Sequence, residues 1–304
     1  MLNVSYPLLL DGGLSNELEK QGLKLNHPLW TAELIESHPE GIIEAHVRYL
    51  KAGADCILTS SYQASLQGFL DLSYSEADAM KLIAKSVDLA VEARDIFMSS
   101  HFKAKMPLIG ASIGPYGAYL ADGSEYRGDY QVNDDVLHDF HVSRFEVLDG
   151  SKADFLACET IPSWSEARVL SELIERATKP AWVSFSCKDG KHINDGTSIK
   201  QCAIQLSKNT NIFAVGVNCT APEHVSTLIS ELKPVNSNKR IVVYPNSGEI
   251  FHANDKTWSG REHSFDLVQG VQEWLALGAD IVGGCCRIGP DEINQFQQLT
   301  SQIR

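Results

Sequence analysis

The sequence of 304 residues lacks several features that mark common classes of protein. No apolar run approaches the roughly 18 residues of a transmembrane helix, so we expect no membrane association. Basic residues are scarce, with 26 lysines and arginines against 39 acidic residues, and the formal net charge of −13 would repel a phosphate backbone. The G-x-G-x-x-G and P-loop patterns of nucleotide-binding proteins do not occur. These absences leave a globular protein with a small or cationic substrate and no nucleic-acid partner.

The sequence also lacks the cysteine pattern of a disulfide framework and any interdomain linker. The chain has seven cysteines, an odd number, and none of them shows C-x-x-C spacing. The first residues, MLNVSYPLLLDGG, lack the basic segment of a secretory leader. We therefore expect reduced thiols and a cytoplasmic location. No Pro- or Ser-rich stretch divides the chain, which favours one domain over residues 1–304.

Short apolar runs alternate with helix-like segments along the whole chain. They are near-continuous runs, as expected of parallel strands that are buried on both faces. The eight candidate strands span residues 6–13, 55–62, 107–114, 154–160, 181–187, 213–220, 241–248 and 280–286. Eight such units predict an α/β fold, a single (β/α)8 TIM barrel, whose typical length is about 250 residues. A doubly wound sheet is the main alternative, and the missing nucleotide fingerprint disfavours it.

Local patterns indicate where several helices begin. Ser37, Ser73 and Ser163 each stand three residues before a glutamate, which is the pattern of a capping box. Apolar residues at helical spacing predict a helix over about 38–51 that ends before Gly53. The segments LKAGADCIL and LALGADIVG are alike and suggest repeated βα units.

In a barrel of this kind the chemistry takes place where the carboxyl ends of the strands meet. The residues that close the predicted strands are Asp11, Gly12, Gly13, Ser61, Tyr62, Gln63, Ser112, Glu159, Thr160, Asn218, Cys219, Tyr244, Asn246, Cys285 and Cys286. Three of them are cysteines, Cys219 from the sixth strand and Cys285 and Cys286 from the eighth. Three thiolates could bind Zn²⁺ and leave its fourth position open, with Gly283 and Gly284 allowing a sharp turn. The alternative is that these cysteines are buried as small apolar residues, which we expect of Cys56, Cys158, Cys187 and Cys202.

Three weaker signals compete with a cysteine site. Residues 110–114 match G-x-S-x-G around Ser112, but a nucleophile elbow requires a helix directly after the serine, and Pro115-Tyr-Gly opens a loop instead. His138 and His141 are one helical turn apart and could share a metal, although barrel helices lie outside the active site. Asp11 and Glu159 could form an acid/base pair or could cap backbone N–H groups.

As a set, the motifs resemble those of the homocysteine S-methyltransferase family, a zinc-dependent barrel family. In chain order they are LLLDGGLSNELEKQG, HPLWTAELIESHPE, TSSYQAS, GVNCT, YPNSGE and GGCCRIGP, which span nearly the whole sequence. The resemblance implies that Cys219, Cys285 and Cys286 bind one Zn²⁺ per chain. It also implies that the thiol of homocysteine is methylated to give methionine. The chain ends soon after the last predicted helix, and this short end together with TSSYQAS and YPNSGE favours a sulfonium donor, S-methylmethionine or S-adenosylmethionine.

The resemblance also suggests substrate contacts. Asp11 and Glu159 could bind the ammonium group of homocysteine, and the N–H groups of Gly12 and Gly13 its carboxylate. Aromatic faces suit a sulfonium cation, which points to Tyr62 and Tyr244 and, with less support, Trp258. Further expected contacts come from Gln63, Asn218 and the loop 249–262. A betaine-type homocysteine methyltransferase and a non-catalytic zinc or thiol redox sensor remain as alternatives, and a homo-oligomer is left open.

Overall fold

Eight parallel strands form one sheet at the centre of the molecule. The computed structural model describes residues 4–25, 27, 29–236, 238–252, 257–261 and 265–303, with the side chains of 250–252, 257, 258 and 261 excepted. In spatial order the strands are β1 (Leu8–Leu9), β10 (Ile281–Val282), β7 (Arg240–Tyr244), β6 (Ile212–Asn218), β5 (Ala181–Phe185), β4 (Phe155–Ile161), β3 (Leu108–Ile113) and β2 (Cys56–Leu58).

Backbone pairing closes this sheet into a barrel. Leu10 forms a parallel bridge with Cys56, and the N–H of Asp55 donates to the carbonyl of Leu9 at 2.8 Å, which joins β1 to β2. The predicted (β/α)8 barrel is confirmed. The first and eighth strands are shorter than predicted, with only two residues each in the ladder. After two residues, each of these strands leaves the ladder and continues into the loop at the carboxyl end of the barrel.

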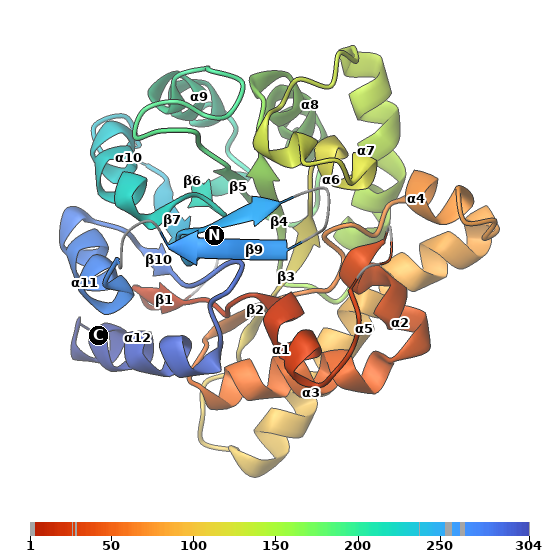
Figure 1. Ribbon diagram of the computed structural model, residues 1–304, viewed down its shortest axis with the longest axis horizontal. Coiled ribbons are helices and arrows are strands. Elements are labelled where there is room, and N and C mark those ends of the chain that lie inside the picture. Colours follow the sequence, from red (N-terminus) through yellow and green to blue (C-terminus); the bar gives the residue numbers. More distant parts are fainter. Residues whose placement is uncertain are drawn as a thin grey trace.

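Helices surround the barrel on all sides (Figure 1). The α-helices are α1 (Leu14–Lys20), α2 (Leu34–Ser37), α3 (Pro39–Lys51), α4 (Leu66–Leu70), α5 (Glu76–Ser100), α6 (Tyr116–Leu120), α7 (Asp134–Asp149), α8 (Trp164–Glu175), α9 (Ile199–Leu206), α10 (Val225–Leu232), α11 (Leu267–Leu277) and α12 (Pro290–Ile303). Short 3₁₀ turns are η1 (Trp30–Glu33), η2 (Ser124–Tyr126) and η3 (Pro222–His224). In the described part of the chain, no helix combines the length and apolarity needed to cross a membrane.

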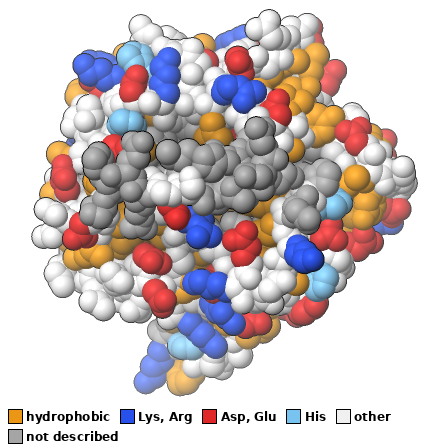
Figure 2. Space-filling model, viewed as in Figure 1, with side chains coloured by type: hydrophobic (Ala, Val, Ile, Leu, Met, Phe, Trp, Pro, Cys, Tyr) orange, Lys and Arg blue, Asp and Glu red, His pale blue; other side chains and the backbone are white. Residues whose placement is uncertain are grey.

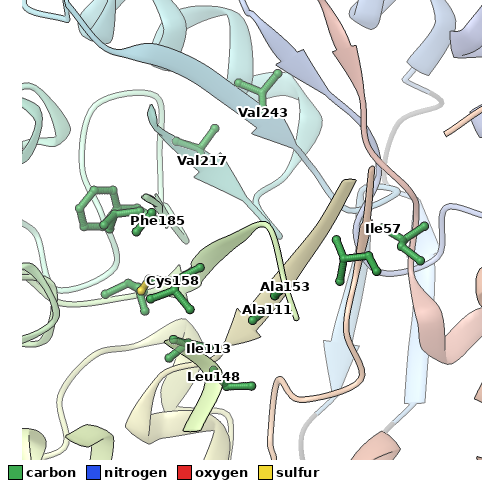
Figure 3. Packing of buried hydrophobic residues seen from close by; sticks show 14 of the residues in the cluster. Ile57, Ala111, Ile113, Leu148, Ala153, Cys158, Phe185, Val217 and Val243 are labelled. Carbon is green, nitrogen blue, oxygen red and sulfur yellow. The ribbon is translucent and has the colours of Figure 1, made fainter. Parts of the chain in front are cut away.

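Alternating side chains of the strands build two layers of core, because successive residues of a strand point to opposite faces. Ile57, Val217 and Val243 point outward and pack with helix residues in the larger cluster (Figure 3). Their neighbours point inward, and Trp182 and Tyr244 fill the barrel with ring centroids 5.8 Å apart. The inward side chains nearest the carboxyl end therefore form the floor of any site above them.

Only one of the three predicted capping boxes starts a helix at the expected serine. Ser163 accepts a hydrogen bond from the N–H of Glu166 and caps α8. The prediction for Ser73 is wrong, because Ser75 caps α5 by accepting from the N–H of Asp78. The prediction for Ser37 is also wrong: it closes α2, and α3 begins at Pro39, whose fixed φ suits a first helical turn.

An additional antiparallel hairpin interrupts the seventh βα unit, between β7 and α11. It consists of β8 (Glu249–His252) and β9 (Thr257–Arg261) and crosses in front of the barrel strands in Figure 1. The hairpin occupies residues 249–261, where a loop over 249–262 was expected. Glu249 accepts from Arg287 at 3.1 Å, which ties the start of the hairpin to the β10–α12 loop. On this side of the molecule acidic and basic side chains are interspersed (Figure 2).

Candidate functional site

A cavity of about 430 Å³ opens at the carboxyl end of the strands. Its described lining includes ten of the eleven site residues expected from the sequence, and Asn218 is the one that it does not include. Those lining residues are Asp11, Gly12, Gly13, Tyr62, Gln63, Glu159, Cys219, Tyr244, Cys285 and Cys286. The barrel topology therefore gathers residues that lie far apart in the sequence.

The three cysteines form a compact cluster in this cavity. The Sγ atoms of Cys219 and Cys286 are 3.5 Å apart, those of Cys285 and Cys286 are 4.0 Å apart, and all three lie within 4.8 Å of one another. Sulfurs that share a tetrahedral zinc with bonds of about 2.3 Å lie roughly 3.8 Å apart. The cluster thus fits a metal ion with three thiolate ligands.

Backbone geometry at the end of β6 presents Cys219 to the cavity. Cys219 has φ of 44° and Thr160, at the end of β4, has φ of 58°, a left-handed conformation that is uncommon for such residues. Asn218 holds the two turns together. Its Oδ1 accepts from the N–H of Thr160 at 2.6 Å and its Nδ2 donates to Thr160 Oγ1 at 2.7 Å. Its Nδ2 is also 4.0 Å from the sulfur of Cys285.

Two glycines allow the other two cysteines to approach. A Cβ on Gly283 would lie 2.6 Å from Leu10, and one on Gly284 would lie 2.3 Å from Ile288. Neither glycine has a positive φ. These two positions therefore require glycine because a side chain would clash with its neighbours. The expected reason, a backbone conformation that only glycine adopts easily, does not apply. The turn is fixed by the N–H of Cys285, which donates to the carbonyl of Pro245 at 2.8 Å.

Two buried carboxylates face the cavity near the thiols. Burial raises the pKa of Glu159 to about 7, although Ser112 donates a hydrogen bond to its Oε1. Burial also raises the pKa of Asp11 well above its usual range, and the N–H of Leu58 donates to its Oδ2 at 2.9 Å. The expected cap of a backbone N–H by Asp11 is thus present, and its role toward a substrate stays a prediction. A cation in the cavity would stabilise both ionised forms.

The structure places the other expected substrate contacts around these acids. Tyr244 bonds to Ser184 Oγ at 2.7 Å, and Gln63 donates to the carbonyl of Ala118 at 2.5 Å. The expected role of Gly13 requires a correction, because its N–H already donates to the carbonyl of Ile288 at 2.9 Å. A Cβ on Gly12 would lie 2.3 Å from the same oxygen. The pair of glycines thus lets the β10–α12 loop pack closely.

Trp30, Glu125 and Tyr126 are among the cavity residues that sequence reasoning missed. Trp30 lies edge-on to Tyr62, with ring centroids 6.1 Å apart. Glu125 and Tyr126 come from η2, and the hydroxyl of Tyr126 is 3.2 Å from the sulfur of Cys219. For Glu125 and Tyr126, the long loop after the third strand was the signal that could have found them, because such loops build the catalytic face of a barrel.

The competing signals have structural explanations. Ser112 lies inside β3, where its hydroxyl donates to Glu159, so it is not on a nucleophile elbow. His138 is exposed beside Asp139, whereas His141 is fully buried and donates to Glu166 at 2.8 Å. Burial lowers the pKa of His141 to about 4. The two histidines therefore do not share a metal site.

The remaining cysteines are buried, as expected. Cys56, Cys158, Cys187 and Cys202 are free thiols within the core, and burial raises the pKa of Cys158 and Cys202 to about 12. The side chain of Trp258 lies outside the described residues, so its expected contact with the donor stays a prediction.

Comparisons with known proteins identify the family of the chain. A family model described as homocysteine S-methyltransferase matches residues 8–300. Homocysteine S-methyltransferase YbgG from Bacillus subtilis is 46% identical over 99% of this chain and 96% of that protein. The homocysteine S-methyltransferase of Escherichia coli is 42% identical over 94% of this chain and 93% of its own. The metallated form of the Escherichia coli homocysteine methyltransferase MmuM superposes with a TM-score of 0.86 at 39% identity, covering 96% of this chain and 95% of that one. The chain belongs to the homocysteine S-methyltransferase family.

Proposed function

We propose that this protein transfers a methyl group from a sulfonium donor to the thiol of homocysteine and so forms methionine. S-Methylmethionine is the preferred donor, and S-adenosylmethionine is used more slowly. The observation that carries the proposal is the convergence of three thiols on a cavity that also contains two desolvated carboxylates. A thiol switch has no need of such a cavity, which disfavours a redox sensor.

Cys219, Cys285 and Cys286 would hold one Zn²⁺ per chain. Thiolate ligands suit zinc, and three protein ligands leave a position for a substrate, as in catalytic sites. When bound, zinc lowers the pKa of a thiol that enters its coordination sphere and so supplies a thiolate at neutral pH. Asn218 keeps the ligand-bearing ends of β4 and β6 in register, and we assign it a positioning role behind the thiols.

Glu159 and Asp11 bind and orient the amino-acid end of homocysteine. Both carboxylates are buried beside the cysteines, where they gain most from a cationic partner such as the α-ammonium group. Ser112 and Leu58 hold these carboxylates in place by donating hydrogen bonds. The substrate thiol is thereby directed toward the three cysteines.

The transfer step needs no acid or base from the protein. The thiolate sulfur attacks the methyl carbon in line, the new S–C bond forms, and the old C–S bond breaks with its electron pair going to the donor sulfur. That sulfur leaves as a neutral thioether, so no proton is required. Trp30 and Tyr62 present an aromatic pair at the cavity, which stabilises the donor cation before transfer. The chain's contribution is therefore binding, orientation and exclusion of water.

Parallel assays test the proposal. The zinc-loaded protein is incubated with homocysteine and, separately, S-methylmethionine, S-adenosylmethionine or betaine, and methionine is quantified. We expect the fastest turnover with S-methylmethionine and slower turnover with S-adenosylmethionine. Robust turnover with betaine and none with S-methylmethionine would establish the betaine-type alternative. No methionine from any donor would refute the proposed activity.

The proposal leaves two further expectations for experiment. Assembly into a homo-oligomer can be measured by sedimentation of the purified chain. A cytoplasmic location, expected from the unpaired cysteines, can be measured by fractionation of cells.

A further inference from the structure

Glu125 is a carboxylate of the cavity to which homocysteine binding gives no role. It lies in η2, in the loop between β3 and α7, next to Tyr126. Burial, and to a smaller extent the charge of Cys219, raises the pKa of Glu125. The loop is firmly placed. Ser186 donates to the carbonyl of Glu125 at 3.0 Å, and a Cβ on Gly117 would lie 2.5 Å from the Glu125 nitrogen. The position of Glu125 is thus set by packing against two other parts of the barrel face.

The side chain of Glu125 is incompletely satisfied. Its Oε2 is inaccessible to water and has no hydrogen-bond partner among the described residues. A buried acceptor without a donor is unfavourable, more so when it carries charge. The other inner acids of the cavity differ, because Asp11 accepts from Leu58 and Glu159 accepts from Ser112. The protein therefore compensates the carboxylate of Glu125 poorly, and because Glu125 is only half-buried and lines the cavity, a cationic ligand could reach it.

The charge of the cavity indicates what kind of ligand this is. Its described lining contains the carboxylates of Asp11, Glu19, Glu125 and Glu159, and Lys24 is its cationic side chain. Glu19 is half exposed and lies 3.6 Å from Arg287, so its charge is compensated outside the cavity. Two amino-acid substrates would bring two ammonium groups, and Asp11 and Glu159 account for one of them.

We propose that Glu125 binds the α-ammonium group of the methyl donor and thereby selects amino-acid sulfonium donors over cations that lack N–H groups. This inference rests on the proposed function. The ammonium groups of S-methylmethionine and S-adenosylmethionine can donate to the Glu125 carboxylate, whereas the quaternary nitrogen of betaine has no N–H to donate. The aromatic pair of Trp30 and Tyr62 attracts any cation, so it does not make this distinction. Glu125 supplies the discrimination between donor classes.

Substitution of Glu125 tests the inference with two sulfonium donors. Dimethylsulfoniopropionate has the sulfonium and carboxylate of S-methylmethionine but no ammonium group. Its affinity is measured as a KM if it transfers its methyl group, or as an inhibition constant against S-methylmethionine if it does not. The matched control is Asp129→Asn, which removes the same charge from an exposed position of the same loop. Zinc content, the KM for homocysteine and the Tm of the ligand-free protein complete the set.

For Glu125→Gln we expect the KM for S-methylmethionine to rise about 10- to 100-fold, the usual effect of losing a hydrogen bond to a charged group. The constant for dimethylsulfoniopropionate, the KM for homocysteine and the zinc content should stay within about twofold of wild type, as should every value for Asp129→Asn. The ligand-free Tm should not fall, because the substitution removes an unpartnered buried charge.

Three results would overturn the inference. They are an unchanged KM for S-methylmethionine, an equal loss of affinity for both sulfonium compounds, and a rise in the KM for homocysteine alone. A marked fall in Tm would show that Glu125 is structural, and it too would overturn the assignment. Failure of the proposed function gives a different outcome, since wild-type protein would then form no methionine from either sulfonium donor.

Discussion

The two ends of the barrel use carboxylates in opposite ways. At the amino end, an aspartate precedes each of three strands and accepts from the backbone N–H of the strand before it in the chain. Asp55 accepts from Leu9 at 2.8 Å, Asp154 from Ile109 at 2.8 Å, and Asp280 from Ile241 at 2.9 Å. Asp154 also lies 3.3 Å from Arg94, and Asp280 lies 2.8 Å from Arg240. These carboxylates are thus hydrogen-bonded to the backbone, and those of Asp154 and Asp280 also form salt bridges.

At the carboxyl end, Asp11 and Glu159 are buried near the thiols and Glu125 is half-buried, and none of the three forms a salt bridge within the described part of the chain. Burial raises the pKa of Glu125 and of Glu159 to about 7. The comparison teaches that carboxylates with protein hydrogen-bond donors join neighbouring strands at the amino end. Carboxylates whose charge the protein balances poorly mark the end that binds a cation. Perturbed acids of this kind are typical of functional sites. Substitutions at the two ends should therefore separate stability from activity.

The largest effect is expected at the thiols. Cys219→Ser should lose the metal and lower activity by at least about 10³-fold, because a hydroxyl is a poor zinc ligand and the site depends on three thiolates. The fold should persist, since the barrel core lies beneath the site. Metal analysis, turnover and circular dichroism measure the three quantities.

The same exchange at Cys202, which is buried on α9, serves as the control and should retain metal and turnover. Full zinc in Cys219→Ser would show that the three-thiolate assignment is wrong.

A smaller effect is expected at Glu159. Glu159→Gln should raise the KM for homocysteine about 10- to 100-fold, because the amide keeps the shape but loses the charge that binds the ammonium group. Zinc content should not change. Steady-state kinetics with homocysteine as the varied substrate give the answer, and an unchanged KM would remove Glu159 from the binding site.

The amino end should show the reverse behaviour. Asp154→Ala leaves the N–H of Ile109 without its side-chain acceptor and should lower the free energy of unfolding by about 1–2 kcal/mol. The KM for homocysteine should stay within about twofold of wild type. Urea unfolding and kinetics on the same preparation measure both. A raised KM with unchanged stability would contradict the division between the two ends.

The smallest effect concerns Tyr126. Its hydroxyl bonds to Cys219, and hydrogen bonds to a ligand tune the affinity of a metal site. Tyr126→Phe should weaken zinc binding by up to about tenfold, as measured by competition with a chelator. Unaltered zinc affinity together with altered stability would indicate that Tyr126 only packs against the cluster.

The repeated segments LKAGADCIL and LALGADIVG find their explanation in the same comparison. Each ends a helix at a glycine with positive φ, Gly53 or Gly278, and each then places an aspartate under the neighbouring strand. The likeness of the two segments thus reflects a shared structural task at the amino end. The likeness was visible in the sequence, but the hydrogen bonds that explain it join residues 46 and 39 positions apart in the chain.

The sequence by itself determined the alternation of buried strands and helices, because hydrophobic periodicity and glycine positions act within a few residues. It also determined which residues end the strands, and so the three cysteines, Asp11, Glu159 and Tyr244. The first residues of the helices were harder to predict from the sequence. Ser75 caps α5 where Ser73 was expected, and α3 begins at Pro39 where Ser37 was expected as the cap.

Only the tertiary structure decided how these residues act together. Gly13 was expected to bind a carboxylate, yet its N–H is taken by Ile288, 275 positions away in the chain. Glu125 and Tyr126 reach the thiols through a loop whose path no local pattern specifies. Distance, burial and hydrogen bonding between remote segments depend on how the whole chain packs, and these set the charge and the open space of the site.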